Sequence, residues 1–327
     1  MEPLQLLAWL ASGEPVDAAA LAARAGVPSA SIPGHVDALR ARGVPVEARG
    51  NSYCLPWPLQ MLDGARIRAA LQAPWASSLA SLEVHGELDS TSSELQRRLA
   101  TASDLSIVMA ESQSAGRGRL GRRWLSPPGL NLYLSCLKRF ENGLAALSGL
   151  SLAVGVMVLR ALGELGVSGA GLKWPNDVLA VVDDVPGKLA GILVELSGDY
   201  RGRCAAIIGI GLNLRLTPAL HRQTGQPACD LASLTAGAAL DRNEVAAALI
   251  TALAQGLHQF QREGFAAFEV EYAQHDLLRG RPLRLTGALG TFEGMGVGVD
   301  RHGLLQVQLA DGSLRGFDSA DITVRRA

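Results

Sequence analysis

The stretch ESQSAGRGRLGRRWLSPPGLNLYLS, residues 111–135, is the most informative segment of this chain. From Gly116 to Arg123 it contains three glycines and four arginines. Glycines let a backbone approach a ligand and let a loop reorganise, while arginines supply forked donors for phosphate or carboxylate groups. The segment therefore predicts a loop that holds a polyphosphate or acyl-phosphate ligand. A solvated basic turn is the alternative interpretation of GRGR taken alone.

The spacing of Gly116, Gly118 and Gly121 also matches the dinucleotide-binding pattern GxGxxG. That pattern has to open a helix directly. Here the glycines are followed by Trp124 and then by the prolines of 127–128, which cannot continue a helix. No phosphate-binding GxxxxGK[ST] pattern occurs either. We therefore predict an irregular arginine loop.

Four further segments combine glycine, proline or charged residues with apolar runs: GELDSTSSEL (86–95), LKWPNDVLA (172–180), PGKLAGILVEL (186–196) and IIGIGLNL (207–214). Each has a plain structural interpretation. Asp89-Ser90-Thr91 is typical of a helix N-cap, and Lys188, just before an apolar strand, is expected to extend to solvent. Gly209 and Gly211 interrupt a strand, which often marks close approach of a ligand or of another backbone.

The N-terminal region has the element order of a winged helix-turn-helix. Apolar residues at helical spacing predict helices at 3–11, 16–25 and 32–42. The alternating VPVEARGNSYCL, with its Gly50-Asn51 turn, predicts a hairpin. Prolines at 56 and 58 then lead out of this region, so we expect a first domain at 1–63.

The remainder divides into an enzyme core at 64–275 and a small β-domain at 276–327. Alternating strands and helices predict an α+β or α/β core. The strands expected there are 107–110, 131–137, 189–196 and 205–212, and the long helices are 144–165 and 242–263. Short strands joined by glycine-rich turns predict a small C-terminal β-barrel.

Composition limits the classes of function. The chain has 327 residues, 48% of them hydrophobic, with 30 basic and 31 acidic residues. This balance argues against a protein that coats polyanions. The four cysteines form no metal-binding spacing, and the chain begins without a basic leader or a long apolar run. We therefore expect a cytoplasmic protein with no membrane association.

Together the strings EsQsaGRGRlGRrW, KWPND, GKLAGILVE and IGIGLN, in this order, resemble the biotin–protein ligases of the class with an N-terminal winged helix-turn-helix domain. The resemblance covers essentially the whole chain. It implies an α+β protein with a central mixed-sheet catalytic domain of the biotin/lipoate ligase type and a C-terminal SH3-like β-barrel. It also implies that biotin and ATP, with Mg²⁺, form biotinyl-5′-AMP, and that biotin then passes to a lysine ε-amine of a biotin carboxyl carrier protein, an acetyl-CoA carboxylase subunit.

The resemblance assigns roles to matching residues. It gives catalytic roles to Lys188, Arg119 and Arg122. The residues that it assigns to biotin are Ser90, Thr91, Ser92, Gln113, Gly116, Arg117, Gly118, Arg119, Lys188, Gly191, Gly209 and Gly211. Those that it assigns to ATP or the adenylate are Arg119, Arg122, Trp124, Lys173, Asn176, Asp177 and Asn213. It names no metal ligand, so Mg²⁺ enters with ATP and lies near Asp177 at most.

Three positions depart from the family pattern. Ser92 replaces the usual asparagine of the biotin loop, and Leu120 replaces an arginine of the glycine-rich loop. No tryptophan lies at 228–230 to stack on adenine, so the adenine contact stays unassigned.

The resemblance further implies a possible homodimer through the central sheet and a possible DNA operator. Residues 1–62 carry four arginines, no lysine and five acidic residues, and Pro33 and Gly34 fall within the expected recognition helix. We therefore predict an interrupted third helix and weak DNA binding. Two alternatives stay open, a lipoate–protein ligase and a ligand-sensing transcriptional repressor without catalysis.

Overall fold

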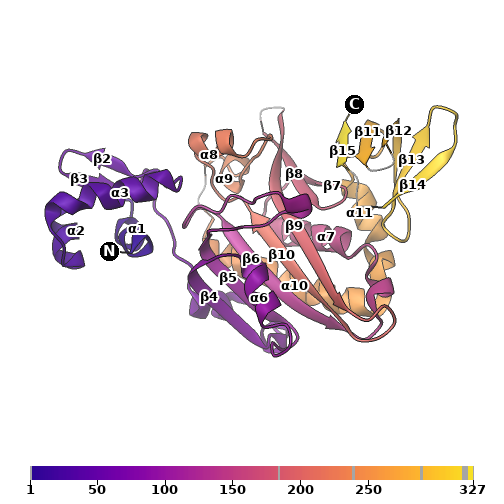
Figure 1. Cartoon of the computed structure of the whole chain (residues 1–327), viewed down its shortest axis with the longest axis horizontal. Coiled ribbons are helices and arrows are strands. Elements are labelled where there is room, and N and C mark those ends of the chain that lie inside the picture. The colour runs from indigo at the N-terminus through magenta and orange to yellow at the C-terminus, as the bar shows by residue number, and fades with distance from the viewer. Residues whose placement is uncertain (1, 183–184, 238–239, 288–289, 319–322, 327) are drawn as a thin grey trace.

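Three groups of elements follow one another along the chain (Figure 1). A computed structural model describes residues 2–182, 185–237, 240–287, 290–318 and 323–326. In Figure 1 the N-terminal group is indigo, the central group runs from purple to orange, and the C-terminal group is yellow. The N-terminal and C-terminal groups lie on opposite sides of the central one.

The N-terminal group combines three helices with a three-stranded sheet of order β1-β3-β2. Its elements are α1 (Pro3–Leu10), β1 (Val16–Asp17), α2 (Ala18–Ala25), the 3-10 turn η1 (Ser29–Ser31), α3 (Ile32–Ala41), β2 (Glu47–Arg49) and β3 (Ser52–Cys54). The Asp17 carboxylate caps α2 by accepting from the Ala19 N–H, and Gly26 ends this helix with a φ of 64°. The apolar faces of these elements share one buried cluster.

The prediction that the third helix is interrupted is wrong. Helix α3 runs without a break from Ile32 to Ala41, with Pro33 in its first turn. Proline is tolerated there because the N–H groups of the first turn have no intrahelical acceptor. Any argument about DNA binding therefore depends on charge alone.

The central group is built on a seven-stranded mixed sheet of order β4-β5-β6-β10-β9-β8-β7. Among the described strand pairs of this sheet, only β4–β5 is parallel. The strands are β4 (Ser81–Leu88), β5 (Ser106–Gln113), β6 (Leu132–Phe140), β7 (Ala170–Lys173), β8 (Asp177–Val182), β9 (Val185–Gly198) and β10 (Cys204–Leu212). All four predicted strands are present, and Lys188 lies inside β9 rather than before it.

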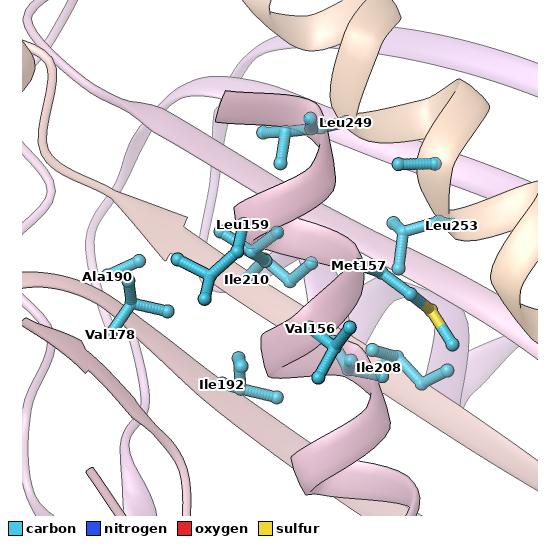
Figure 2. Close-up of a cluster of buried hydrophobic side chains, with 14 of the residues drawn as sticks. Val156, Met157, Leu159, Val178, Ala190, Ile192, Ile208, Ile210, Leu249 and Leu253 are labelled. Carbon is cyan, nitrogen blue, oxygen red and sulfur yellow. The ribbon is translucent and has the colours of Figure 1, made fainter. Parts of the chain in front are cut away.

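Two long helices, α7 (Leu150–Glu164) and α10 (Arg242–Glu263), cover one face of this sheet. Figure 2 shows side chains of β8, β9 and β10 directed at α7 and α10, among them Ile192, Ile208 and Ile210. Side chains of a strand alternate between its two faces. Gly209 and Gly211 therefore face away from the helices, toward the opposite side of the sheet.

Two details of the core differ from the sequence prediction. The helix expected at 144–165 is divided into the 3-10 turn η3 (Leu144–Leu147) and α7, because Gly149 has a φ of 77° and lies against the Phe265 ring. Strand β10 is continuous through Gly209 and Gly211, so the prediction that these glycines interrupt it is wrong. Because glycine has no side chain, these two residues leave the surface of the strand bare on one face, while the hydrogen bonds of the strand remain complete.

The C-terminal group forms a five-stranded antiparallel sheet of order β14-β13-β12-β11-β15. Its strands are β11 (Pro282–Gly287), β12 (Gly290–Val299), β13 (Leu305–Leu309), β14 (Leu314–Phe317) and β15 (Thr323–Arg326). Buried apolar residues of this sheet, including Leu283, Val307 and Phe317, join the core cluster of the central group. Among the described residues β14 and β15 are edges without mutual pairing, so the sheet is not closed.

The remaining elements are short helices. They are α4 (Gly64–Ala70), α5 (Trp75–Ser78), α6 (Thr91–Arg97), η2 (Arg119–Gly121), α8 (Pro218–Gln223), α9 (Leu231–Leu234), η4 (Gly264–Phe268) and α11 (Glu269–His275). In the part of the chain that the structure describes, no helix has the length and apolarity needed to cross a bilayer. The architecture is α+β, with a mixed sheet at its centre.

Candidate active site

One cavity of about 740 Å³ opens on the sheet face that α7 and α10 leave uncovered. It is within the size range of small-molecule sites. All five sequence segments contribute to its wall. The predicted site residues that line it are Ser90, Thr91, Ser92, Gln113, Arg117, Gly118, Arg119, Arg122, Trp124, Lys173, Asn176, Asp177, Lys188, Gly191, Gly209 and Gly211.

The glycine- and arginine-rich segment is a small hairpin rather than the irregular loop predicted from sequence. Arg117 and Arg123 pair as an antiparallel bridge, and the Gly118 N–H donates to the Arg122 carbonyl at 2.7 Å. The tip is formed by Leu120 and Gly121, with φ values of 55° and 70°. Two successive positive φ angles are the pattern of a tight hairpin turn, and the non-glycine residue there, Leu120, is exposed. Backbone hydrogen bonds therefore give this segment a defined shape, although its glycine and arginine content suggested an open loop.

The base of this hairpin is held to strand β9 by a bidentate ion pair. The two terminal nitrogens of Arg117 donate to the two oxygens of Glu195 at 2.8 and 2.7 Å. A forked arginine–carboxylate pair fixes geometry as well as charge. This pair thus fastens the hairpin beside the cavity.

Lys188 does not extend into solvent. Its ammonium lies 2.7 Å from the Asp177 carboxylate and 5.4 Å from the centre of the Trp124 ring, and its side chain is 16% exposed. Behind it, the Asn213 amide donates to the Lys188 carbonyl at 3.1 Å. The lysine is therefore a fixed, largely buried cation at the wall of the cavity.

The KWPND segment is the tight connection between β7 and β8. Lys173 and Asp177 are cross-strand neighbours, and residues 174–176 form the turn between them. The Asn176 amide donates to the Ile192 carbonyl at 2.9 Å, and the buried Trp174 indole donates to the Gly303 carbonyl at 3.0 Å. These bonds fasten the turn to β9 and to the connection between the C-terminal strands that end at Val299 and begin at Leu305, so Asp177 has a fixed position opposite Lys188.

The opposite end of the cavity is lined by hydroxyl and amide groups. Ser90 caps α6, as the sequence predicted, while the Thr91 N–H donates to the Gln113 side chain at 2.9 Å. The hydroxyls of Thr91 and Ser92 lie 2.7 and 2.9 Å from that of Ser135. This end therefore offers several neutral hydrogen-bonding groups and no charged side chain among these residues.

The three cavity glycines of β9 and β10 lie against a side chain. A Cβ atom on Gly211 would lie 2.3 Å from the Trp124 ring, and one on Gly191 would lie 2.8 Å from it. On Gly209 it would lie 2.7 Å from the Ser92 hydroxyl. The buried Trp124 indole N–H has no hydrogen-bond partner among the described residues. The Trp124 ring therefore occupies the space that side chains at positions 191 and 211 would need.

Arg119 lies at the tip of the hairpin, partly buried. Burial lowers the pKa of its guanidinium below the usual value, and the carboxylates of Asp177 and Asp318 oppose that shift. Asp318 belongs to the C-terminal group, so charges from two regions face this arginine. Such a cation is suited to an anionic ligand, which would relieve the cost of its burial.

Two predicted residues lie outside the cavity wall. Gly116 lines a neighbouring cavity of about 1140 Å³ on the other side of the hairpin, and Asn213 supports the backbone behind Lys188. The sequence analysis missed the 224–227 segment and Val324, which also line the first cavity. It also missed Ser135, which joins Thr91 and Ser92. No motif marks 224–227 or Val324, because only the folded chain brings them to the site, whereas Ser135 is the last residue of the segment 111–135.

Within the described residues no group of three or more His, Cys, Asp or Glu side chains could hold a metal ion. Asp177 is the carboxylate of the cavity nearest to Lys188, which already pairs with it. Mg²⁺ commonly binds through one or two carboxylates together with substrate phosphates. The residues present therefore fit a metal that arrives with a nucleotide better than a resident metal.

The family model described as "Biotin/lipoate A/B protein ligase family" matches residues 86–213, and "Biotin protein ligase C terminal domain" matches residues 280–325. The bifunctional ligase/repressor BirA proteins of Escherichia coli and Salmonella typhimurium are each 37% identical to the chain, over 99% of it and 98% of their own length. A solved structure titled as the biotin protein ligase of Aquifex aeolicus in complex with biotin and ATP has a TM-score of 0.64 and 32% identity, over 76% of this chain and 100% of that one.

The chain belongs to the biotin protein ligase family. Membership accords with the strings that carry the resemblance, since all four lie within residues 86–213.

Proposed function

We propose that this protein is an ATP-dependent biotin–[acetyl-CoA-carboxylase] ligase. In the first step a biotin carboxylate oxygen attacks the α-phosphorus of ATP, and the bond to pyrophosphate breaks. In the second, the ε-amine of an acceptor lysine attacks the acyl carbon of biotinyl-5′-AMP, AMP leaves, and the amine loses a proton. The observation that carries the proposal is the pairing of one polar cavity with the arginine hairpin and Lys188.

The two ends of the cavity differ in charge, so each suits a different end of the ligand. Neutral donors and acceptors at Ser90, Thr91 and Gln113 suit the ureido group of biotin, which carries no charge. Cations at Arg119 and Lys188 suit the carboxylate and phosphoryl oxygens, which repel each other in the absence of counter-charge. The substrate carboxylate is itself the nucleophile, so no Ser-His-Asp arrangement is needed.

The hairpin would protect the reaction intermediate from water as well as supply positive charge. The Arg117–Glu195 pair holds its base, and its tip at 119–121 brings the Arg119 guanidinium toward the carboxylates of Asp177 and Asp318. A hairpin that closes over the mixed anhydride would exclude water from it. Mg²⁺ would balance charge on the ATP phosphates near Asp177.

The first expected result is pyrophosphate exchange that depends on biotin. Labelled pyrophosphate should enter ATP when biotin is present and should not when lipoate replaces it, because the Aquifex aeolicus structure named above is a biotin protein ligase in complex with biotin and ATP. The measurement is radiolabel recovered in ATP from the purified protein. Exchange that responds to lipoate alone would favour a lipoate ligase, and no exchange with either acid would favour a repressor without catalysis.

The proposal extends to the flanking domains. We assign residues 1–63 to a winged helix-turn-helix domain, 64–275 to the catalytic domain and 276–327 to an SH3-like domain. The order helix, helix, helix, hairpin supports the first assignment, and the match at 280–325 supports the last. The acceptor would be a biotin carboxyl carrier protein, the site of action cytoplasmic, and a homodimer would form through the central sheet.

DNA binding by the N-terminal domain should be weak, although the BirA relatives are named repressors. Three of its four arginines are engaged by carboxylates: Arg40 by Asp37, Arg42 by Glu87 and Arg49 by Glu47. Affinity for DNA depends on cations available to phosphates. The net charge of −1 over residues 1–62 leaves few such cations.

A salt titration of the full chain, with biotin and ATP present, on double-stranded DNA from its own promoter measures this affinity. We expect micromolar or weaker binding, and a shallow dependence on salt because few cations are available to contact phosphates. Nanomolar, sequence-specific binding at physiological salt would contradict the prediction.

A further inference from the structure

Ser135 lies directly behind the hydroxyl-lined end of the cavity. It is fully buried in β6, where it pairs with Gly209 of β10. Its hydroxyl lies 2.7 Å from that of Thr91 and 2.9 Å from that of Ser92, and both of these residues line the cavity. The three hydroxyls therefore form one hydrogen-bonded chain, with Ser135 in its middle and its two ends at the cavity wall.

The Gln113 side chain fixes one end of this chain. Its carbonyl oxygen accepts from the Thr91 N–H at 2.9 Å, and its amide nitrogen donates to the Ser126 hydroxyl at 2.9 Å. Because a backbone N–H can only donate, the oxygen of this amide has to face Thr91. The Thr91 hydroxyl donates to the same oxygen at 3.3 Å. The single proton of the Thr91 hydroxyl is therefore directed at Gln113.

The direction of this first bond decides the direction of the others, because a hydroxyl has one proton to donate and two lone pairs to accept with. With the Thr91 proton used, Ser135 has to donate to Thr91. Ser92 then has to donate to Ser135, and only its lone pairs are left for the cavity. The opposite direction would break the bond between Thr91 and Gln113. Ser92 is thus oriented to accept a hydrogen bond from a ligand.

We propose that Ser135 is a positioning residue that sets the direction of this chain, so that Ser92 accepts from a ring N–H of the biotin ureido group. This rests on the proposed ligase function. A site built to hydrogen-bond a group rejects an analogue that lacks it, because the polar group of the site is then left unpaired. The dithiolane ring of lipoate has no N–H, so the oriented chain also selects against lipoate.

The test is Ser135→Ala, with Ser106→Ala as its matched control. Both serines are buried in neighbouring strands, but Ser106 begins β5 at the opposite end from Gln113, and its hydroxyl donates to the Ser103 carbonyl at 2.8 Å. Ser135→Ala should raise the Kd for biotin, measured by calorimetry without ATP, about tenfold, as expected for the loss of one oriented neutral hydrogen bond. Ser106→Ala should leave this Kd within about twofold of wild type.

Steady-state kinetics separate positioning from a general structural defect. Ser135→Ala should raise the KM for biotin and leave kcat and the KM for ATP near wild type, because Arg119 and Lys188 are unchanged. Ser135→Cys covers the case in which Ser135→Ala does not fold. A thiol is similar in shape but is a weak donor and a weak acceptor, so this variant should weaken biotin binding in the same direction.

A double-mutant cycle tests whether Ser135 acts through Ser92. Once Ser92→Ala has removed the oriented acceptor, the further substitution Ser135→Ala should weaken biotin binding by less than about twofold. Fully additive effects of the two substitutions would contradict the proposed relay.

Desthiobiotin, which keeps the ureido ring and lacks the sulfur-containing ring, tests which part of the ligand the chain contacts. Ser135→Ala should weaken desthiobiotin by the same factor as biotin. The inference is overturned if the two factors differ, or if the Kd of Ser135→Ala for biotin equals that of Ser106→Ala. Failure of the ligase assignment would appear separately, as wild-type protein that neither binds biotin nor shows biotin-dependent pyrophosphate exchange.

Discussion

Replacing Lys188 with alanine should lower both adenylate formation and transfer by about a hundred- to a thousandfold. Removal of one preorganised donor at a developing negative charge typically costs this much, about 3–4 kcal/mol. Lys188 is held for that role by Asp177 at 2.7 Å and by the Trp124 face. Each step is measured in single-turnover format, adenylation without the acceptor and transfer from preformed adenylate.

Stability needs its own control, because the variant removes the ammonium that lies 2.7 Å from the Asp177 carboxylate. Lys138 forms a comparable pair with Asp104 at 2.6 Å, and its side chain is 7% exposed, but it lies outside the cavity. Lys138→Ala should lower the melting temperature while leaving both rates near wild type. Lys188→Arg should restore only part of the rate that Lys188→Ala loses. Arginine keeps the positive charge, but that charge is delocalised over a larger fork. If folded Lys188→Ala keeps both rates within about threefold of wild type, the lysine has no catalytic role.

The second large effect is expected from Arg119→Gly. The substitution removes a cation from the hairpin tip and lets the backbone adopt more conformations. A lost hydrogen bond to a charged group costs about 1.5–3 kcal/mol, or about ten- to a hundredfold faster escape of the adenylate. Released adenylate would then biotinylate bystander proteins without selection.

Bystander labelling is measured with serum albumin added beside the normal acceptor, and adenylate release by rapid filtration. Leu120→Gly is the control, because it also places a glycine in the hairpin tip and removes no charge. It should leave labelling confined to the acceptor. Equal bystander labelling by both variants would show that backbone flexibility, and not the lost charge, releases the adenylate. No bystander labelling by Arg119→Gly would refute the idea that Arg119 retains the adenylate.

Local patterns in the sequence were sufficient to predict much of the secondary structure of this protein. The helix at Arg242–Glu263, the hairpin at 47–54 and the cap at Ser90 follow from spacing and capping rules that act within a few residues. Motif order was sufficient for the family. The same local rules failed at Pro33, which the first turn of α3 tolerates, and at Gly149, which divides the helix expected at 144–165.

By itself the sequence determined the chemistry, because arginine, lysine and glycine at these spacings carry their charges and backbone freedom into any fold. Only the tertiary structure decided how those groups are arranged. It pairs Lys188 with Asp177 and Arg117 with Glu195. It also places the Trp124 ring against the backbone of Gly191 and Gly211. It also brings Gly43 to Leu220 across 177 residues of chain, 220 minus 43. Such contacts come from the packing of distant apolar surfaces, which no local periodicity encodes.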